Sequence, residues 1–462
     1  MTAPMTDLSP ALEWLPDRLA ELMREFQVPG MAVGVLVDGR RLGLTAGVTH
    51  VQLGYPVVDR TVFQIGSNTK LLTATAAMRA VDAGLLHVDA LVRDYLPTFT
   101  LADPQAAAAI RVRHLLTHTS GIDGDYHGPP GLGFADDMLS RFVDGLRGVE
   151  LLHPPGAMWS YCNAGWVVLG RVLESVFGAP YHQLMHDEVF EPLGMRDTLI
   201  LPEQILSRSV AMGHLPDLVD SSPRPAPVYL TTPPCAPAGS VPVSTTEDML
   251  RFLQMHLQGG RASDGARFLS EHAVRLMQQP VAAIPPTGHL DAMGLGWMLG
   301  RTTGGRRTLG HGGGTVGQIS VLEVLPDANL AVVTLSNAYG GGLAGLALME
   351  QVLDVLGGAT LPPRPVPPGV PVPLDLAPYA GTYRRTGTTV EVSVVDRELR
   401  IVIDEEPLVP EARTAPPIVT VAPIDASLFV NQAGALVRFF EFDERGRPGY
   451  LFNFRLLRRV GP

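Results

Sequence analysis

The sequence is almost without lysine. Lys70 is the only lysine among 35 basic residues, and the other 34 are arginine. One interpretation is that a single lysine survived by chance. The other is that position 70 requires an amine that can lose its proton, which a buried lysine can do and an arginine cannot. We favour the second, because Lys70 follows a serine by three residues at the start of an apolar run.

The sequence also has few cysteines, no long apolar run and no net positive charge. The chain has two cysteines, Cys162 and Cys235, which does not suggest a disulfide scaffold. No apolar run approaches the roughly 20 residues of a membrane helix, and the first ten residues show no signal peptide. A net charge of −11 disfavours binding to nucleic acid or an anionic membrane. We therefore expect a soluble, cytoplasmic protein without nucleic-acid or membrane partners.

The 462 residues exceed one ordinary hydrophobic core, so two domains are expected. Within the first part of the chain, strand-like apolar runs lie near both ends and amphipathic helices flank them. The strand runs are 31–37, 40–47, 318–325 and 330–337, and the helices are 11–26 and about 342–356. We predict an α/β domain over residues 1–360: an antiparallel sheet flanked by helices, with residues 67–300 as a large helical insertion.

A proline-rich segment, residues 361–378, is typical of a stiff, extended linker. Beyond it, residues 379–462 carry short alternating apolar runs separated by Gly, Pro and Asp. This pattern predicts a small all-β barrel. Its last run, Tyr450–Arg459, is expected to be one strand that carries Arg455.

The Ser67-Asn68-Thr69-Lys70 segment opens a helical run that Gly84 should close. A serine at a helix start lies beside unpaired N–H groups and the positive end of the helix dipole. Lys70, three residues later, projects from the same face and can reach the serine oxygen. The motif is weak by itself, because an N-cap serine followed by a surface lysine has the same spacing.

The motifs that follow in the chain resemble, in their order, those of the serine β-lactamase-related family. They are Gly84–Asp89, Tyr95–Pro97, Val112–Gly121, Pro155-Gly156, Tyr161–Asn163, Glu191–Met195, Ala238–Ser240, Ser244–Asp248 and His311–Gly313. This family contains class C β-lactamases, D-Ala-D-Ala peptidases and D-aminopeptidases. The resemblance covers about residues 10–357 and is greatest to the penicillin-binding-protein-type thioesterases, peptide cyclases with a C-terminal lipocalin-like barrel.

The resemblance implies a catalytic role for Ser67 as nucleophile, with Lys70 as its partner. It matches Tyr161 and Asn163 to the family's Tyr-x-Asn element. Tyr161 would shuttle a proton, helped by a pKa that a neighbouring ammonium lowers, and Asn163 would hold Lys70 and a substrate amide. Whether Lys70 or Tyr161 is the general base is left open.

His311, Gly312 and Gly313 occupy the place where many relatives have Lys-Thr-Gly. The imidazole of His311 would change charge near neutral pH, so we expect pH-dependent activity there. Gly313 and Gly314 would let a substrate backbone lie along the strand. The resemblance also implies an oxyanion hole made of the Ser67 and Gly314 N–H groups.

Three further features carry alternatives. Arg455 is either an exposed strand arginine or a residue that reaches the active site and binds a substrate carboxylate or carbonyl. His118 resembles a structural core histidine. The i,i+4 pairs His114/His118 and His182/His186 have metal-ligand spacing but no supporting ligands, so we expect no metal and no cofactor.

By resemblance, the favoured function is a penicillin-binding-protein-type thioesterase. Such an enzyme would release and head-to-tail cyclise a non-ribosomal peptide with a D-residue at its C-terminus, presented as a thioester on a carrier protein. The alternatives are a D-amino-acid peptidase or amidase, an esterase and a β-lactamase. A non-catalytic peptide sensor is disfavoured, because Ser67, Lys70 and Tyr161 are all intact.

Overall fold

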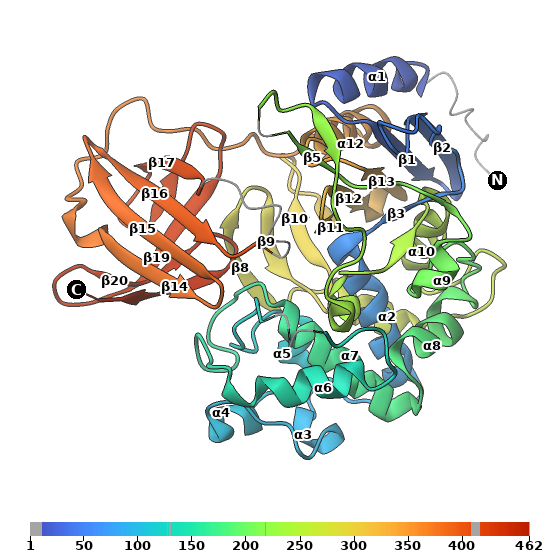
Figure 1. Ribbon diagram of the computed structural model, residues 1–462, viewed down its shortest axis with the longest axis horizontal. Coiled ribbons are helices and arrows are strands. Elements are labelled where there is room, and N and C mark those ends of the chain that lie inside the picture. Colours follow the sequence, from blue (N-terminus) through green and yellow to red (C-terminus); the bar gives the residue numbers. More distant parts are fainter. Residues whose placement is uncertain (1–11, 127, 129–130, 218, 408–415, 462) are drawn as a thin grey trace.

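The structure is a computed structural model that describes residues 12–126, 128, 131–217, 219–407 and 416–461. Its centre is an eight-stranded antiparallel sheet in the order β2-β1-β13-β12-β11-β10-β9-β8 (Figure 1). The strands are β1 (Gly30–Val37), β2 (Arg40–Gly47), β8 (Ala282–Thr287), β9 (Leu290–Met293), β10 (Met298–Arg301), β11 (Arg307–Thr315), β12 (Gln318–Leu325) and β13 (Leu330–Ser336). The predicted α/β fold with an antiparallel sheet is confirmed.

The two predicted strand pairs meet in the middle of this sheet. β1 and β2 form a hairpin whose turn residues, Asp38 and Gly39, both have positive φ angles of 49° and 78°. β1 then pairs with β13, so that Met31 lies opposite Ser336, 305 residues later. The Asn337 side chain accepts a hydrogen bond from Gly30 N (2.7 Å), which fixes this distant pairing at its end.

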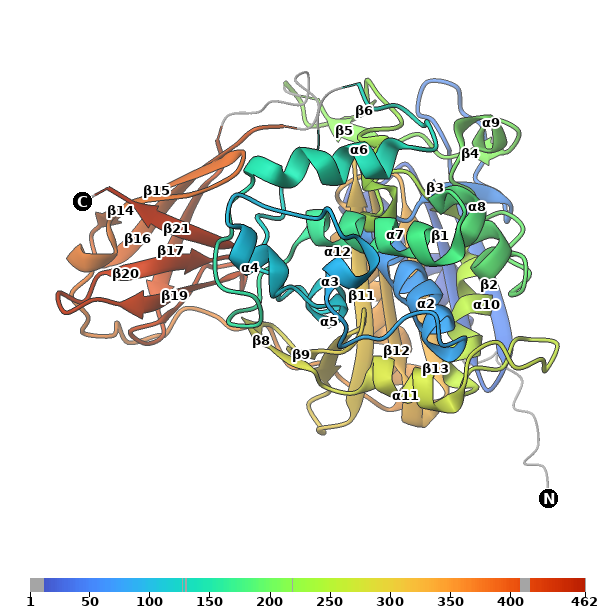
Figure 2. The ribbon, with the colours of Figure 1, turned by 90° about the horizontal axis from the view of Figure 1, so that it is seen from below.

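Helices cover both faces of the sheet. The terminal helices α1 (Leu15–Glu25) and α12 (Gly341–Gly357) share one apolar cluster with β1 and β13. The helix α10 (Thr246–Leu257) contacts β1 and β13 from the insertion side (Figure 2). The amphipathic run predicted from residue 11 begins as α1 at Leu15, with Pro16 in its first turn, where a proline loses no helical hydrogen bond.

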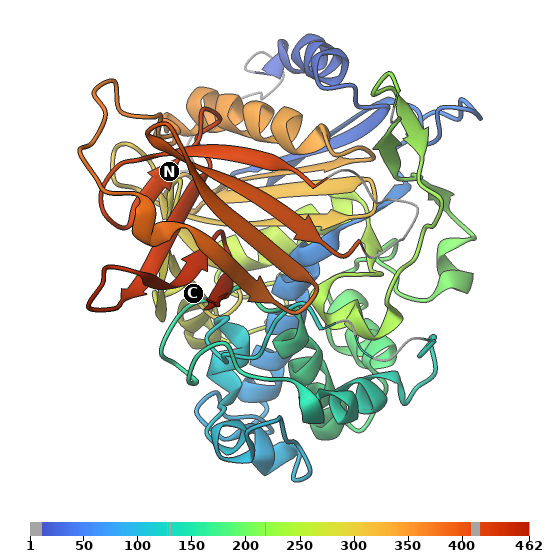
Figure 3. The same cartoon turned by 60° about the vertical axis from the view of Figure 1, so that its left-hand side comes forward.

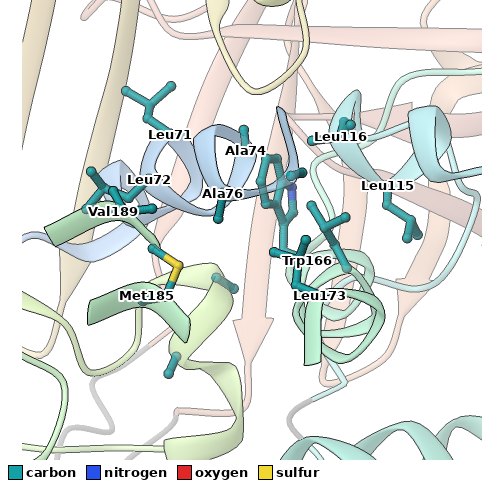
Figure 4. Close-up of a cluster of buried hydrophobic side chains, with 14 of the residues drawn as sticks. Leu71, Leu72, Ala74, Ala76, Leu115, Leu116, Trp166, Leu173, Met185 and Val189 are labelled. Atoms are coloured by element: carbon teal, nitrogen blue, oxygen red, sulfur yellow. The ribbon is translucent and has the colours of Figure 1, made fainter. Parts of the chain in front are cut away.

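The insertion is built around a buried helix, α2 (Thr69–Asp82). Eleven of its residues are buried, as expected for a helix with apolar or small residues on every side. Leu71, Leu72 and Ala76 lie among side chains from other helices of the insertion (Figure 4). The other helices there are α3 (Val92–Tyr95), α4 (Pro104–Ala108), α5 (Val112–Leu116), α6 (Met138–Gly145), α7 (Asn163–Phe177), α8 (Tyr181–Met185), α9 (Pro202–Ile205) and α11 (Glu271–Gln278).

The insertion is shorter than the predicted range 67–300. Residues 282–301 form β8, β9 and β10, which extend the main sheet beyond β11. These strands are short, and β8 contains Pro285, a residue compatible with an edge strand but not with a central one. Short strands sit in two further sheets, one of β3 (Thr61–Gln64), β4 (Ser209–Val210) and β7 (Val243–Ser244), and one of β5 (His214–Pro216) and β6 (Pro223–Pro225).

The C-terminal part is a closed eight-stranded barrel, which confirms the predicted small all-β fold (Figure 3). Its strands are β14 (Gly381–Arg385), β15 (Thr388–Val395), β16 (Glu398–Glu405), β17 (Ile418–Pro423), β18 (Leu428–Val430), β19 (Leu436–Phe442), β20 (Pro448–Phe452) and β21 (Leu456–Val460). The single strand predicted over Tyr450–Arg459 is wrong. A tight turn at residues 453–455 divides it, and Phe454 has a φ of +74° there.

This last turn joins the barrel to the segment that precedes α7. Tyr161 N donates a hydrogen bond to the Phe454 carbonyl (3.1 Å), and Leu456 N donates to the Ser160 hydroxyl (3.1 Å). Around these bonds, Trp159 and Phe452 belong to one apolar cluster with side chains of β9 and β10. The turn is therefore held by backbone bonds and by buried side chains.

In the described parts of the chain, no helix combines the length and apolar character of a membrane span.

Candidate active site

Ser67 lies in a short 3₁₀ turn, Gly66–Asn68, between β3 and α2. Gly66 has a φ of +52°, and a Cβ added to it would come within 2.5 Å of Gly314 N on β11. Glycine at this position therefore lets the nucleophile turn and β11 approach more closely than a side chain would allow. The Ser67 side chain remains partly exposed at the floor of the site.

Lys70 is completely buried one helical turn further on. Its Nζ lies 3.0 Å from Ser67 Oγ, 2.8 Å from Asn163 Oδ1 and 2.6 Å from the Ala238 carbonyl oxygen. Burial, followed by the positive charge of Arg455, holds the pKa of Lys70 well below its usual range. The two carbonyl oxygens can only accept hydrogen bonds. A neutral amine would satisfy them with its two N–H groups and turn its lone pair to the Ser67 hydroxyl.

Tyr161 stands on the other side of Ser67, in the segment before α7. Its hydroxyl interacts with the Ser67 side chain, and Lys70 Nζ lies 4.8 Å from its ring centroid. The expectation of a lowered pKa is wrong: burial raises the pKa of Tyr161 to about 12. Removal of water destabilises a phenolate here by more than the nearby cations stabilise it, because the buried Lys70 is itself held neutral. Tyr161 therefore keeps its proton and can donate it.

His311 lies on β11 with its ring centroid 6.3 Å from that of Tyr161. Its Nδ1 is 2.7 Å from the Gly312 carbonyl oxygen, to which an Nδ1–H would donate, and its Nε2 has no partner among the described residues. Burial, then the nearby Lys70, lowers the pKa of His311 to about 3. The expected change of charge near neutral pH is therefore wrong. His311 stays neutral there and offers Nε2 as an acceptor.

The backbone of β11 passes directly beside the nucleophile turn. A Cβ on Gly313 would lie 2.0 Å from the Ile65 carbonyl oxygen, so no other residue fits at this position. A Cβ on Gly66 would likewise lie 2.5 Å from Gly314 N, so the Ser67 and Gly314 N–H groups proposed for the oxyanion hole belong to two backbones in direct contact.

A buried polar clamp, which the sequence reasoning missed, holds the nucleophile turn to β12, the strand that pairs with β11. The Asn68 side chain donates to Ser320 Oγ (2.7 Å), and Ser320 Oγ donates to the Ile65 carbonyl (2.7 Å). Gln64 N donates to Gln318 Oε1 (3.0 Å) on the same strand, β12. A polar residue at a core-facing position of the apolar run 318–325 was the signal that could have identified Ser320.

Arg455 reaches the site from the β20–β21 turn. The carbon of its guanidinium lies 5.0 Å from the Tyr161 ring centroid, and its Nε lies 3.0 Å from Asp125 Oδ1. Arg385, on the barrel strand β14, is also paired with Asp125 and is almost completely buried. Of the two alternatives for Arg455, the structure shows the residue beside the active site. Asp125 was missed, since a single aspartate in a loop carries no sequence signal.

His118 lies behind Tyr161, stacked on its ring at 4.3 Å. It is buried, and its Nδ1 accepts a hydrogen bond from Cys162 N (2.9 Å). Burial also holds the pKa of His118 well below its usual range. This is the position of a structural core histidine. His114, its i,i+4 neighbour, instead accepts from Arg111 N at 3.2 Å.

The second histidine pair is at the surface. Among the described residues, His186 gathers with Asp187 and Glu191, and all three are exposed. The imidazole Nδ1 of His186 lies 2.8 Å from Asp187. Exposed acidic groups of this kind are common, and nothing in their geometry distinguishes them from an ordinary surface ion pair.

A pocket of about 80 Å³ opens above Ser67. Its lining contains Asn163, Cys235, Gly314 and Thr315. A larger pocket of about 560 Å³ adjoins it, and Thr232 lines both. The larger pocket lies where the insertion meets the barrel.

Comparison with known proteins shows which family this chain resembles. The family model described as Beta-lactamase matches residues 15–355. Penicillin-binding protein 4 of Amycolatopsis lactamdurans is 41% identical over 377 residues, which cover 80% of this chain and 97% of that protein. The D-alanyl-D-alanine-carboxypeptidase/endopeptidase AmpH of Escherichia coli K12 is 27% identical over 324 residues, 66% of this chain and 80% of that protein.

Solved structures extend the likeness to the barrel. The crystal structure of SurE has a TM-score of 0.76 and 26% identity, and the match covers 98% of this chain and all of SurE. SurE solved with D-Leu gives a TM-score of 0.75. The octameric penicillin-binding protein homologue from Pyrococcus abyssi shares the fold, with a TM-score of 0.64 at 21% identity over 98% of this chain and 99% of that one.

Proposed function

The chain belongs to the β-lactamase family of serine hydrolases, and we propose that it is a peptide acyltransferase that forms an acyl-enzyme on Ser67. More specifically, it is a penicillin-binding-protein-type thioesterase that releases and cyclises a peptide ending in a D-residue. The observation that carries the acyl-transfer chemistry is the Lys70 amine, buried with two carbonyl acceptors and 3.0 Å from the Ser67 hydroxyl.

Lys70 acts as the general base in the acylation step. Its lone pair takes the Ser67 proton while Ser67 Oγ attacks the thioester carbonyl. The Ser67 and Gly314 N–H groups stabilise the negative charge that develops on the carbonyl oxygen. The C–S bond then breaks, and Tyr161, which keeps its proton at neutral pH, donates it to the departing thiolate.

The acyl-enzyme is then transferred to an amine of the same peptide. The amine attacks the Ser67 ester and loses a proton to the Tyr161 phenolate left by the first step. The ester C–O bond breaks, and Lys70 returns its proton to Ser67 Oγ. The cycle thus ends with all three groups in their starting protonation states and with an amide in place of the thioester.

The position of the barrel supports the proposal that the acyl group is transferred to an amine of the bound peptide and not to water. It contributes the Phe454–Arg455 turn, which lies against Tyr161. The guanidinium of Arg455 is held by Asp125 through Nε, which leaves its other nitrogens for a substrate carbonyl or carboxylate. An amine held close to the ester gains from proximity, which favours cyclisation over hydrolysis. The likeness to SurE over the whole chain, and the D-Leu with which SurE was solved, support a D-terminal donor.

Hydrolysis of D-peptides is the second candidate. The 41% identity to a penicillin-binding protein over most of this chain favours it. Both candidates use the same acyl-enzyme, and they differ only in whether water or an amine resolves it. An esterase or β-lactamase activity would also use the same Ser67, Lys70 and Tyr161.

The test is intact-protein mass spectrometry with a pair of peptidyl thioesters that differ only in the configuration of the last residue. We expect the D-epimer to acylate the wild type faster than the L-epimer, no adduct on Ser67→Ala, and cyclic product in excess over linear acid. A carrier-bound thioester should behave as the small thioester does. Acylation with only linear acid, whatever the peptide length, would favour the peptidase. No adduct from any donor would contradict the acyltransferase.

A further inference from the structure

The large pocket beside the active site has a chemical character of its own. Its 560 Å³ are enclosed by the insertion, the segment Thr232–Pro234 and the barrel ends Thr386–Thr388 and Glu405–Pro407. Three of its lining residues are carboxylates, and no described lining residue is a lysine, arginine or histidine. Thr232 also lines the Ser67 pocket, so the two pockets are neighbours.

The carboxylates are not all neutralised by the protein. Asp125 pairs with both Arg385 and Arg455, and Glu405 lies 3.4 Å from the same Arg385. Glu406 has no ion-pair partner among the described residues, and only its backbone N–H is bonded, to Gly387 O. Among the described residues, three carboxylates against two arginines leave one negative charge in excess at the pocket wall.

A buried hydroxyl without a hydrogen-bond partner among the described residues also indicates a ligand site. Thr388 lines the pocket and is 5% exposed, yet its Oγ1 makes no hydrogen bond within the described parts of the protein. A buried polar group in this condition costs free energy unless a ligand satisfies it. Thr388 lies directly opposite Glu405 in the β15–β16 pairing, so hydroxyl and carboxylate are neighbours.

Part of the remaining lining is apolar. Tyr126, Leu132, Pro233 and Pro234 face the same space. A ligand that fits must therefore combine a carbon stem with a positively charged end. Three separate acceptors, on Glu405, Glu406 and Thr388, suit the three N–H donors of a primary ammonium better than the planar fork of a guanidinium.

We propose that this pocket is a subsite for a primary alkylammonium group of the peptide substrate. The inference rests on the proposed function only in taking the substrate to be a peptide whose carbonyl reaches Ser67. The ammonium has two sources with the same chemistry, a lysine-type side chain and the free amino terminus, and the experiment separates them.

Binding is measured by calorimetry on the full-length Ser67→Ala protein, so that no acyl transfer is needed. The probes are alanine-based hexapeptides ending in D-leucine. The first set is N-acetylated and carries one lysine, placed at a different position in each peptide. The second has a free amino terminus and norleucine in place of lysine. The third, which is uncharged at both places, is N-acetylated and carries norleucine. We expect at least one ammonium-bearing peptide to bind about ten-fold tighter than the uncharged one. That size is typical of one charge-assisted hydrogen-bond set.

The double change Glu405→Gln and Glu406→Gln should reduce this preference to less than about two-fold. The double change Glu441→Gln and Glu444→Gln is the matched control, since it removes the same two charges from exposed barrel positions outside the pocket lining. Equal affinities for all peptides, or an equal loss in the control, would overturn the subsite. Acylation of wild-type Ser67 by a small thioester without an amine tests the proposed function separately. Its failure would leave the binding result standing.

Discussion

Replacement of Lys70 by arginine should abolish acylation while substrate binding survives. Lys70 Nζ has two obligatory acceptors, Asn163 Oδ1 at 2.8 Å and the Ala238 carbonyl at 2.6 Å, and its lone pair is directed to Ser67. A guanidinium has no lone pair to offer at any accessible pH. General-base catalysis contributes about 10²–10⁴-fold, so we expect a loss of about 10³-fold, or roughly 4 kcal/mol in the barrier.

The assay is single-turnover acylation by a peptidyl thioester, followed by intact mass, with peptide affinity measured in parallel on the same protein. Lys70→Met is the matched control, because it removes the base without introducing a fixed charge. Both variants should lose the same large factor in rate and keep affinity within a few-fold. If Lys70→Arg kept more than about a tenth of the wild-type rate, the proton would have to go elsewhere, and Tyr161 would become the base.

The same lysine predicts a pH dependence of stability. Its pKa is lowered in the folded state and is about 10.5 when exposed, so between these values the unfolded chain binds a proton that the folded chain does not. Stability from this group therefore rises with pH across that window, by up to about 1.4 kcal/mol per pH unit, and falls as pH drops. Chemical unfolding at several pH values should show this slope in the wild type and its loss in Lys70→Met. Equal slopes would refute the neutral amine.

Three other predictions follow from the site. His311→Gln should leave the pH profile of the acylation rate unchanged near pH 6.5, because the pKa of His311 is about 3; an inflection there that this change removes would contradict it. Ser320→Ala removes the clamp between the nucleophile turn and β12, so kcat should fall roughly ten- to hundred-fold with little change in KM; a change in KM alone would argue against positioning. Asp125→Ala leaves Arg385 and Arg455 without their shared carboxylate and should lower the free energy of unfolding by about 3 kcal/mol in a denaturant titration; a loss below 1 kcal/mol would show that the two arginines do not need it.

The local features of this protein were predictable from the sequence. The three-residue spacing of Ser67 and Lys70 at a helix start brings the two groups within reach of each other, although the spacing alone does not require the lysine to be buried. The Asp38-Gly39 turn likewise dictates the β1–β2 hairpin through the positive φ angles that it requires. Alternating apolar residues were sufficient to predict the barrel, since the pattern of a strand depends mainly on its own residues.

Features that depend on distant segments were not predictable in this way. The turn at Phe454 divides a run that reads as one strand, and it is held by the backbone of Tyr161, almost 300 positions earlier. Asp125 became visible only once Arg385 and Arg455 of the barrel were seen to meet it. No local pattern encodes a contact between loops this far apart.

The protonation states of the site residues show the same difference between what the sequence determines and what the tertiary structure decides. The residue types at positions 70, 161 and 311 are in the sequence, and they limit the chemistry to acyl transfer through a serine with an amine, a phenol and an imidazole nearby. Their protonation was decided by the tertiary structure, which buries all three and so disfavours the charged form of each. Desolvation depends on every atom that replaces water around a group, and those atoms come here from the insertion, the main sheet and the barrel together.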